Sequence, residues 1–170
     1  MNRTVTRSFR IDEDAFNAIQ EEASHLNISV NTLVNQQLLS YANFDRFFRR
    51  LGMTKIATAT FAHLLRASSE LEVIEAGRLA GSDVPRSIIL ARDGKLFLDS
   101  VLRYLRMMSD YANLYEYNEV EVDRKRTITL MHELGPKGSL FLIHYVGAIF
   151  SSIEIRPSFS STDHSVTVEF

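Results

Sequence analysis

The chain has 170 residues, of which 45 % are apolar and 24 % are charged, and its formal net charge at pH 7 is −2. This composition is that of a globular protein and excludes long disorder and collagen-like structure. The absence of cysteine excludes a disulfide scaffold, a zinc ribbon, a Cys-ligated iron–sulfur cluster and a thiol nucleophile. No stretch of sequence is apolar enough to cross a bilayer and the first residues lack a secretion signal, so we expect a cytoplasmic protein with no membrane partner.

The first eleven residues combine basic side chains with strict alternation. Residues 1–10 contain three arginines and no acid. Apolar and polar positions alternate over residues 4–11, which predicts a half-buried strand. Its two sides are Val5, Arg7, Phe9 and Ile11 on one face and Thr4, Thr6, Ser8 and Arg10 on the other.

Two short helices are predicted after this strand. Asp12 stands at the N-cap position of the first helix, and Ser29 is the N-cap candidate of the second. Asn27, between them, tolerates the left-handed conformation that ends many helices. The apolar stripe of the second helix continues past Tyr41 as far as Leu51. Because a lone strand has both edges unpaired and cannot close a core, we expect two copies to pair antiparallel in a symmetric homodimer.

The order of strand, cap, helix, left-handed residue, cap and helix carries a resemblance. It lies in the runs TRSFRID (6–12), AFNAI (15–19) and NISVNTLV (27–34). Residues 4–45 resemble the ribbon-helix-helix fold of the Arc, MetJ and CopG repressors. The resemblance implies a DNA-binding and dimerisation domain over residues 1–51, with a two-stranded ribbon in the major groove.

One face of this ribbon carries the candidate base contacts. The major groove admits a two-stranded ribbon, and arginine can contact guanine at O6 and N7, whereas Thr and Ser can donate, accept or touch a thymine methyl group. The predicted base contacts are Thr6, Ser8 and Arg10. The alternative is that these side chains are merely solvated on an edge strand.

Phosphate contacts are predicted beside the ribbon. Unpaired N–H groups and the dipole at the start of the second helix suit a phosphate, and the family resemblance implies that this helix end clamps the DNA backbone. The predicted phosphate contacts are Arg3, Arg7, Ser29, Val30 and Asn31. The alternative for Ser29 is that it only caps its helix.

Residues 52–170 are predicted to form an α+β sensor or oligomerisation domain. Helical spacing predicts a helix from Thr54 and others over 71–79, 85–91 and 96–111, with a break at Asp93-Gly94. Strands are then predicted over 114–122, 127–131, 153–160 and 165–170, around a helix over 139–152. The fold class is therefore α+β, with helices packed on a mostly antiparallel sheet in ββαββ order. In the first strand we expect Tyr115, Tyr117 and the valines to share a face.

This part also carries a resemblance. The run HELGPKGSLFL (132–142), with Tyr145, Phe150 and the closing DHSVTV (163–168), resembles a signature of uncharacterised archaeal regulators that begin with a ribbon-helix-helix. The order of elements is similar to the ligand-binding fold of vinyl-reductase-like and haem-nitric-oxide-associated sensor domains. If this domain receives a signal, we expect its effector to be a small molecule or a partner protein.

Aromatic side chains of this domain are candidates for a ligand pocket between helix and sheet. The candidate pocket residues are Tyr104, Tyr115, Tyr117, His132, Phe141 and Tyr145. The alternative, which we favour, is that such residues form the core or a dimer interface.

We expect no metal, no cofactor and no enzymatic activity. No two of the five histidines lie at i, i+4 or His-x-His spacing. His132-Glu133 is a candidate general-base pair, but the sequence has no nucleophile motif, glycine-rich phosphate loop or recognisable pair of carboxylates.

The sequence therefore predicts a transcription regulator that binds double-stranded DNA as a homodimer, with pairing of dimers into tetramers on DNA left open. Two other classes stay open. An antitoxin would bind a toxin with its C-terminal half, and a ligand-sensing or assembly module would use the ribbon only to dimerise. The balance of six basic and six acidic side chains in the first 50 residues keeps the last alternative open.

Overall fold

The structure, a computed structural model, describes residues 4–123 and 125–170. The chain divides into two compact units, of which the first ends at Arg46 and the second begins at Phe47, whereas the predicted division follows residue 51. No helix among the described residues is long and apolar enough to span a membrane.

The N-terminal unit contains the two predicted helices. They are α1 (Glu13–His25) and α2 (Val30–Ser40), followed by the π-helical turn η1 (Tyr41–Asp45) and, across the division, by α3 (Arg46–Arg50). Both predicted caps are confirmed: Asp12 Oδ1 accepts from the Asp14 N–H (3.1 Å), and Ser29 Oγ accepts from the Thr32 N–H (3.0 Å). Asn27 has a φ of 53°, the predicted left-handed conformation.

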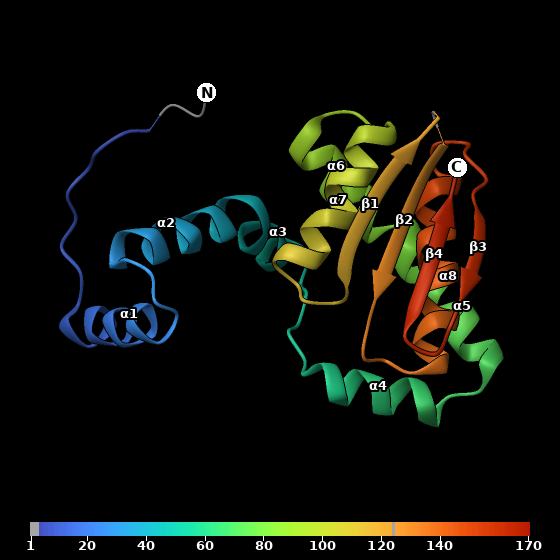
Figure 1. The fold of residues 1–170 in the computed structure, drawn as a ribbon, viewed down its shortest axis with the longest axis horizontal. Coiled ribbons are helices and arrows are strands. Elements are labelled where there is room, and N and C mark those ends of the chain that lie inside the picture. The colour runs from blue at the N-terminus through green and yellow to red at the C-terminus, as the bar shows by residue number, and fades with distance from the viewer. Residues whose placement is uncertain (1–3, 124) are drawn as a thin grey trace. The chain divides into compact units, whose positions relative to one another are not determined.

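The predicted strand over residues 4–11 is absent from the single chain. The segment leads into α1 without strand pairing (Figure 1), and its apolar side chains are exposed, Val5 by 75 % and Phe9 by 74 %. A strand is held by hydrogen bonds to a neighbouring strand, and the described part of the chain offers this segment none.

The C-terminal unit is α+β, and its ββαββ order confirms the prediction. Its helices before the sheet are α4 (Thr58–Ala67), α5 (Glu70–Ser82), α6 (Val84–Asp93) and α7 (Leu98–Asp110). They are followed by β1 (Glu116–Val122), β2 (Lys125–Met131), α8 (Pro136–Ser151), β3 (Ser158–Ser161) and β4 (Ser165–Glu169). All strand pairs are antiparallel, in the spatial order β1-β2-β4-β3. The helix predicted from Thr54 begins only at Thr58, and the strand predicted from 153 begins only at Ser158, after a turn with Glu154 at a φ of 60°.

One face of the sheet is buried and the other is open. Ile128, Leu130, Val166 and Val168 lie on the buried face, which α7 and α8 cover. The expectation that the valines of β1 share the face of Tyr117 is wrong: Val120 and Val122 are 59 % and 61 % exposed. Side chains alternate along a strand, so an odd spacing from Tyr117 puts them on opposite faces.

Helix α8 lies at the centre of this unit, between the sheet and α5 (Figure 1). Two glycines of α5 let its backbone approach α8 closely. A Cβ atom at Gly77 would lie 2.6 Å from the carbonyl oxygen of Phe141, and one at Gly81 would overlap the carbonyl oxygen of Tyr145. These positions therefore require glycine for packing.

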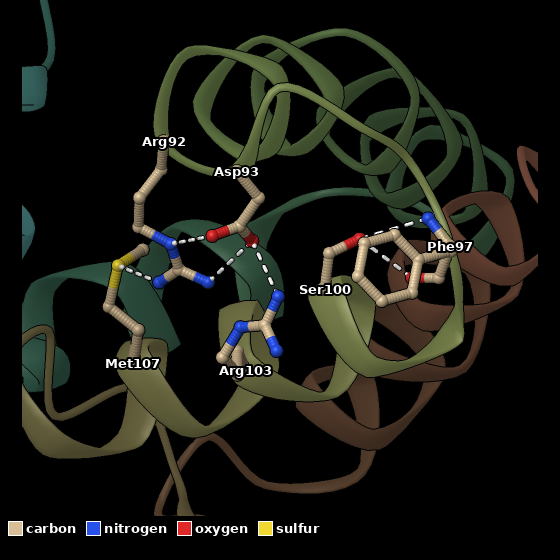
Figure 2. A network of polar contacts seen from close by, with 6 residues as sticks. All are labelled: Arg92, Asp93, Phe97, Ser100, Arg103 and Met107. Carbon is tan, nitrogen blue, oxygen red and sulfur yellow. Dashed lines mark hydrogen bonds and ion pairs between the residues drawn. The ribbon is translucent and has the colours of Figure 1, made fainter.

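A polar network fixes the junction of α6 and α7 (Figure 2). The Arg92 guanidinium donates through Nε to Asp93 Oδ1 (3.2 Å), through Nη2 to Asp93 Oδ2 (3.0 Å) and through Nη1 to the Met107 sulfur (3.4 Å). Arg103 also lies 3.3 Å from Asp93. Burial raises the pKa of Asp93, but the hydrogen bonds and charges of the two arginines hold it below its usual value. Gly94, at a φ of 68°, ends α6 as predicted.

Candidate functional site

The structure places the three predicted base contacts in one exposed extended segment. Thr6, Ser8 and Arg10 are all exposed. Arg10 makes no hydrogen bond or ion pair with any described residue, so its guanidinium is available to a ligand. Arg7, a predicted phosphate contact, is also exposed, and its Nη1 donates to the Thr6 carbonyl (3.2 Å). Arg3 lies outside the described residues.

The start of α2 offers the donors that the phosphate prediction requires. The hydroxyl of Ser29 is occupied as a cap, and it also shares a hydrogen bond with the Thr32 hydroxyl (2.8 Å). The N–H groups of Val30 and Asn31 have no partner within the helix, because the first turn of an α-helix leaves its donors unpaired. Ser29 therefore caps the helix, and the N–H groups that are free to bind a phosphate belong to Val30 and Asn31.

The N-terminal unit also leaves much apolar surface uncovered. Among its described residues the buried apolar side chains are Ala23, Leu33 and Phe44. Eight large ones are exposed by 41 % or more: Val5, Phe9, Ile11, Phe16, Leu26, Leu38, Leu39 and Tyr41. Exposed apolar groups contribute no burial energy, so a unit of this size with so few buried apolar side chains has a small core.

Most of the candidate ligand-pocket residues lie in the core of the C-terminal unit. The hydroxyls of Tyr104 and Tyr145 share a hydrogen bond of 2.6 Å, and Tyr115 donates to the Leu105 carbonyl (3.0 Å). Burial raises the pKa of all three phenols, so they stay neutral. Phe141 stacks on Tyr145 with ring centres 5.7 Å apart. These contacts are those of a packed core with satisfied polar groups.

Tyr117 occupies a different environment from the buried tyrosines. It is half-buried, and its hydroxyl donates to Glu119 Oε2 (2.7 Å). The Arg106 guanidinium lies over its ring, 5.3 Å from the ring centre. Tyr117 is therefore part of a surface polar cluster on β1.

His132 is buried at the end of β2 and locked in one tautomer. Its Nδ1 accepts from the Leu134 N–H (3.2 Å), so in the neutral ring the proton is on Nε2, which donates to the Ser139 hydroxyl (3.0 Å). Ser139 in turn donates to the Thr162 carbonyl (2.5 Å). A histidine that donates to a serine cannot at the same time be the base that activates it. The chain of hydrogen bonds instead ties the start of α8 to the β3–β4 turn.

A cleft of about 700 Å³ opens beside this network, at one end of the sheet. It is lined by the start of α4, the α7–β1 loop, the end of β2 and the β3–β4 turn. The lining residues are Thr58, Asn113, Leu114, Tyr115, Glu116, Met131, His132, Glu133, Thr162, His164 and Ser165. Two of the predicted pocket residues, Tyr115 and His132, are among them. No group of three or more potential metal ligands occurs among the described residues.

Sequence reasoning did not find most of this cleft. Four segments distant in the chain form it, and none has a motif of its own. The one local signal was the pair His132-Glu133, which the sequence offers as a candidate general-base pair. In the structure Glu133 lines the cleft, whereas both ring nitrogens of His132 are engaged in protein hydrogen bonds.

Comparisons with protein-family models, with curated proteins and with solved structures find no match. The function of this chain must therefore be inferred from its residues and their geometry.

Proposed function

We propose that this chain is a sequence-specific DNA-binding transcription regulator that acts as a homodimer through its N-terminal unit. The observation that carries the proposal is the segment 4–11, which is extended, exposed and unpaired, alternates polar and apolar side chains, and leads directly into two capped helices. A segment of this kind requires a second strand.

A second copy of the chain supplies that strand. Antiparallel pairing of two copies satisfies the backbone groups of both and turns Phe9 and Ile11 of each towards the helices. Fully burying a side chain of this kind contributes about 1.5–3 kcal/mol, so four of them offset a substantial part of the cost of association.

The same pairing puts the polar face of the ribbon outward. Thr6, Ser8 and Arg10 of both copies then form one row of hydroxyls and guanidinium groups, which matches the donors and acceptors in the major groove. The free N–H groups of Val30 and Asn31 suit the flanking phosphates. Because the first 50 residues are neutral overall, we expect affinity to depend on the specific site more than on general attraction to DNA.

Selection of bound DNA from a random pool with the full chain tests the proposal. We expect enrichment of a site with twofold symmetry, and Arg10→Ala is expected to weaken binding to that site by about 1–3 kcal/mol and to relax the preference at one base position. Fluorescence anisotropy at fixed salt measures both effects. The matched control is Arg86→Ala, which removes an exposed arginine of α6 and is expected to change neither. A pool without enrichment, or an Arg10→Ala protein that binds as the parent does, would contradict the proposal.

A further inference from the structure

We infer that the cleft at the end of the sheet, between the α7–β1 loop, the end of β2 and the β3–β4 turn, binds a small organic cation such as an aliphatic amine. This property belongs to the C-terminal unit alone and holds whether or not the N-terminal unit binds DNA. It is supported by the size of the cleft, the charges of its lining and the hydrogen bonds that hold its walls.

The size and lining of the cleft suit a small molecule. Its volume of about 700 Å³ lies within the range of small-molecule sites, which are typically about 300–1,000 Å³. Leu114, Tyr115 and Met131 supply an apolar wall, while the hydroxyls of Thr162 and Ser165 supply acceptors. A ligand with a short hydrocarbon chain and a polar end matches this division.

The charges of the lining select the sign of that polar end. Among the described residues no lysine or arginine lines the cleft, whereas Glu116 and Glu133 do. Both carboxylates are exposed, and neither forms an ion pair with a described residue. The start of α4 at Thr58 contributes roughly half a positive charge from the helix dipole, which is less than the two full negative charges. An anion is therefore repelled, and an ammonium group is attracted.

The two histidines do not reverse this balance, since even a proton on His164 together with the roughly half charge of the helix dipole is less than the charge of the two carboxylates. Both ring nitrogens of His132 are engaged, and protonation at Nδ1 would break its hydrogen bond with the Leu134 N–H. Burial and the neighbouring His164 lower the pKa of His132, so it stays neutral near pH 7. The lining of the cleft is thus net negative at that pH.

The wall of the cleft that the end of β2 and the β3–β4 turn form is held in place without a ligand. The His132 N–H donates to the His164 carbonyl (2.9 Å), and the Thr162 N–H donates to the Ser165 carbonyl (2.9 Å). The Thr162 and Ser165 hydroxyls share a hydrogen bond of 2.8 Å, and the Ser139 hydroxyl donates to the Thr162 carbonyl. A preformed site loses little free energy to ordering when a ligand binds.

Titration of the isotope-labelled full chain with 1,4-diaminobutane, followed by NMR in about 0.15 M salt, tests the inference. We expect saturable shifts of backbone amides in residues 113–116, 131–133 and 162–165. Glutarate, a dianion of similar length, is expected to cause none. Absence of saturable shifts, equal shifts with glutarate, or shifts spread over acidic surfaces elsewhere would overturn the inference.

Paired variants identify the groups responsible. Replacement of both Glu116 and Glu133 by glutamine keeps their size and exposure and is expected to weaken diamine binding by about tenfold or more, because charge-assisted hydrogen bonds are lost. Glu70→Gln removes an exposed carboxylate of α5 outside the cleft and is expected to leave the affinity unchanged. Equal affinity in the double variant and the parent would overturn the assignment.

Discussion

At the scale of single residues, the C-terminal unit is stabilised by polar groups that are buried but fully paired. No buried side-chain nitrogen or oxygen among the described residues lacks a hydrogen-bond partner. The cost of losing one partner therefore exceeds the value of the bond itself, because the group left behind is buried and unsatisfied. The tyrosine pair and His132 show this most directly.

The pair of Tyr104 and Tyr145 is expected to behave non-additively. Tyr145→Phe leaves the Tyr104 hydroxyl, which is buried, without its 2.6 Å partner and is expected to cost about 1–3 kcal/mol of unfolding free energy. Adding Tyr104→Phe removes the orphaned group, so the double variant is expected to cost less than the two single variants together. Urea denaturation of the four proteins measures the coupling. Strict additivity would show that the hydroxyls do not interact as described.

His132 is expected to make the unfolding free energy depend on pH. Burial holds its pKa below the usual value, so below about pH 6.5 the unfolded chain binds a proton that the folded chain does not. The contribution of His132 to the free energy of unfolding is therefore complete above about pH 6.5. It is lost as the pH falls towards the pKa that His132 has in the folded chain. Urea midpoints at pH 7.5 and 5.5 measure this loss. The loss of stability is expected to persist in His63→Gln, which changes an exposed histidine of α4, and to shrink in His132→Gln. The same loss in both variants would show that His132 is not its cause.

At the scale of elements, the spacing of apolar residues is enough to predict most helices, because a helix needs only its own chain to form its hydrogen bonds. The strand over 4–11 and the faces of β1 show what spacing cannot supply. A strand depends on a neighbour that the local sequence does not contain. In β1, Tyr117 and the two valines lie on opposite parities and glutamates lie on both, so the alternation does not tell which face is buried. The cleft could not be predicted for the same reason, because segments far apart in the sequence form its walls.

The close approach of α5 and α8 is testable with two glycines. Gly81→Ala puts a methyl group onto the carbonyl oxygen of Tyr145, which is backbone and cannot move aside, and is expected to destabilise the protein by about 1–3 kcal/mol. In Gly147→Ala the new methyl group would lie 3.7 Å from the Phe159 ring, an ordinary contact. This control is expected to be neutral, or stabilising by up to about 1 kcal/mol through helix propensity. Thermal unfolding compares them, and equal effects would contradict the packing described.

At the scale of the whole molecule, the two units differ in how far they are complete by themselves. Among the described residues the C-terminal unit buries 24 apolar side chains and leaves ten large ones exposed, whereas the N-terminal unit buries three and leaves eight large ones exposed. The proposed dimer removes this difference, because the second copy supplies a strand that pairs with residues 4–11 and a surface that covers the exposed apolar side chains.

Phe9 is therefore expected to matter more than its exposure in one chain suggests. Phe9→Ser removes an apolar side chain from each half of the proposed ribbon and is expected to weaken self-association at least about tenfold, together with DNA binding. Leu71→Ser, at a position of α5 that is 79 % exposed, is the matched control and is expected to change neither. Sedimentation equilibrium measures the dimer constant, and unchanged self-association of the Phe9 variant would contradict the proposed interface.

The central claim is that residues 4–11 of two chains pair with each other. NMR of a dimer mixed from isotope-labelled and unlabelled chains observes such contacts directly, since only contacts between the two copies are selected. The account predicts Hα–Hα contacts between residues 4–11 of one chain and 4–11 of the other, with the pattern of an antiparallel ribbon. A segment without contacts between chains, or one that pairs within its own chain, would contradict it.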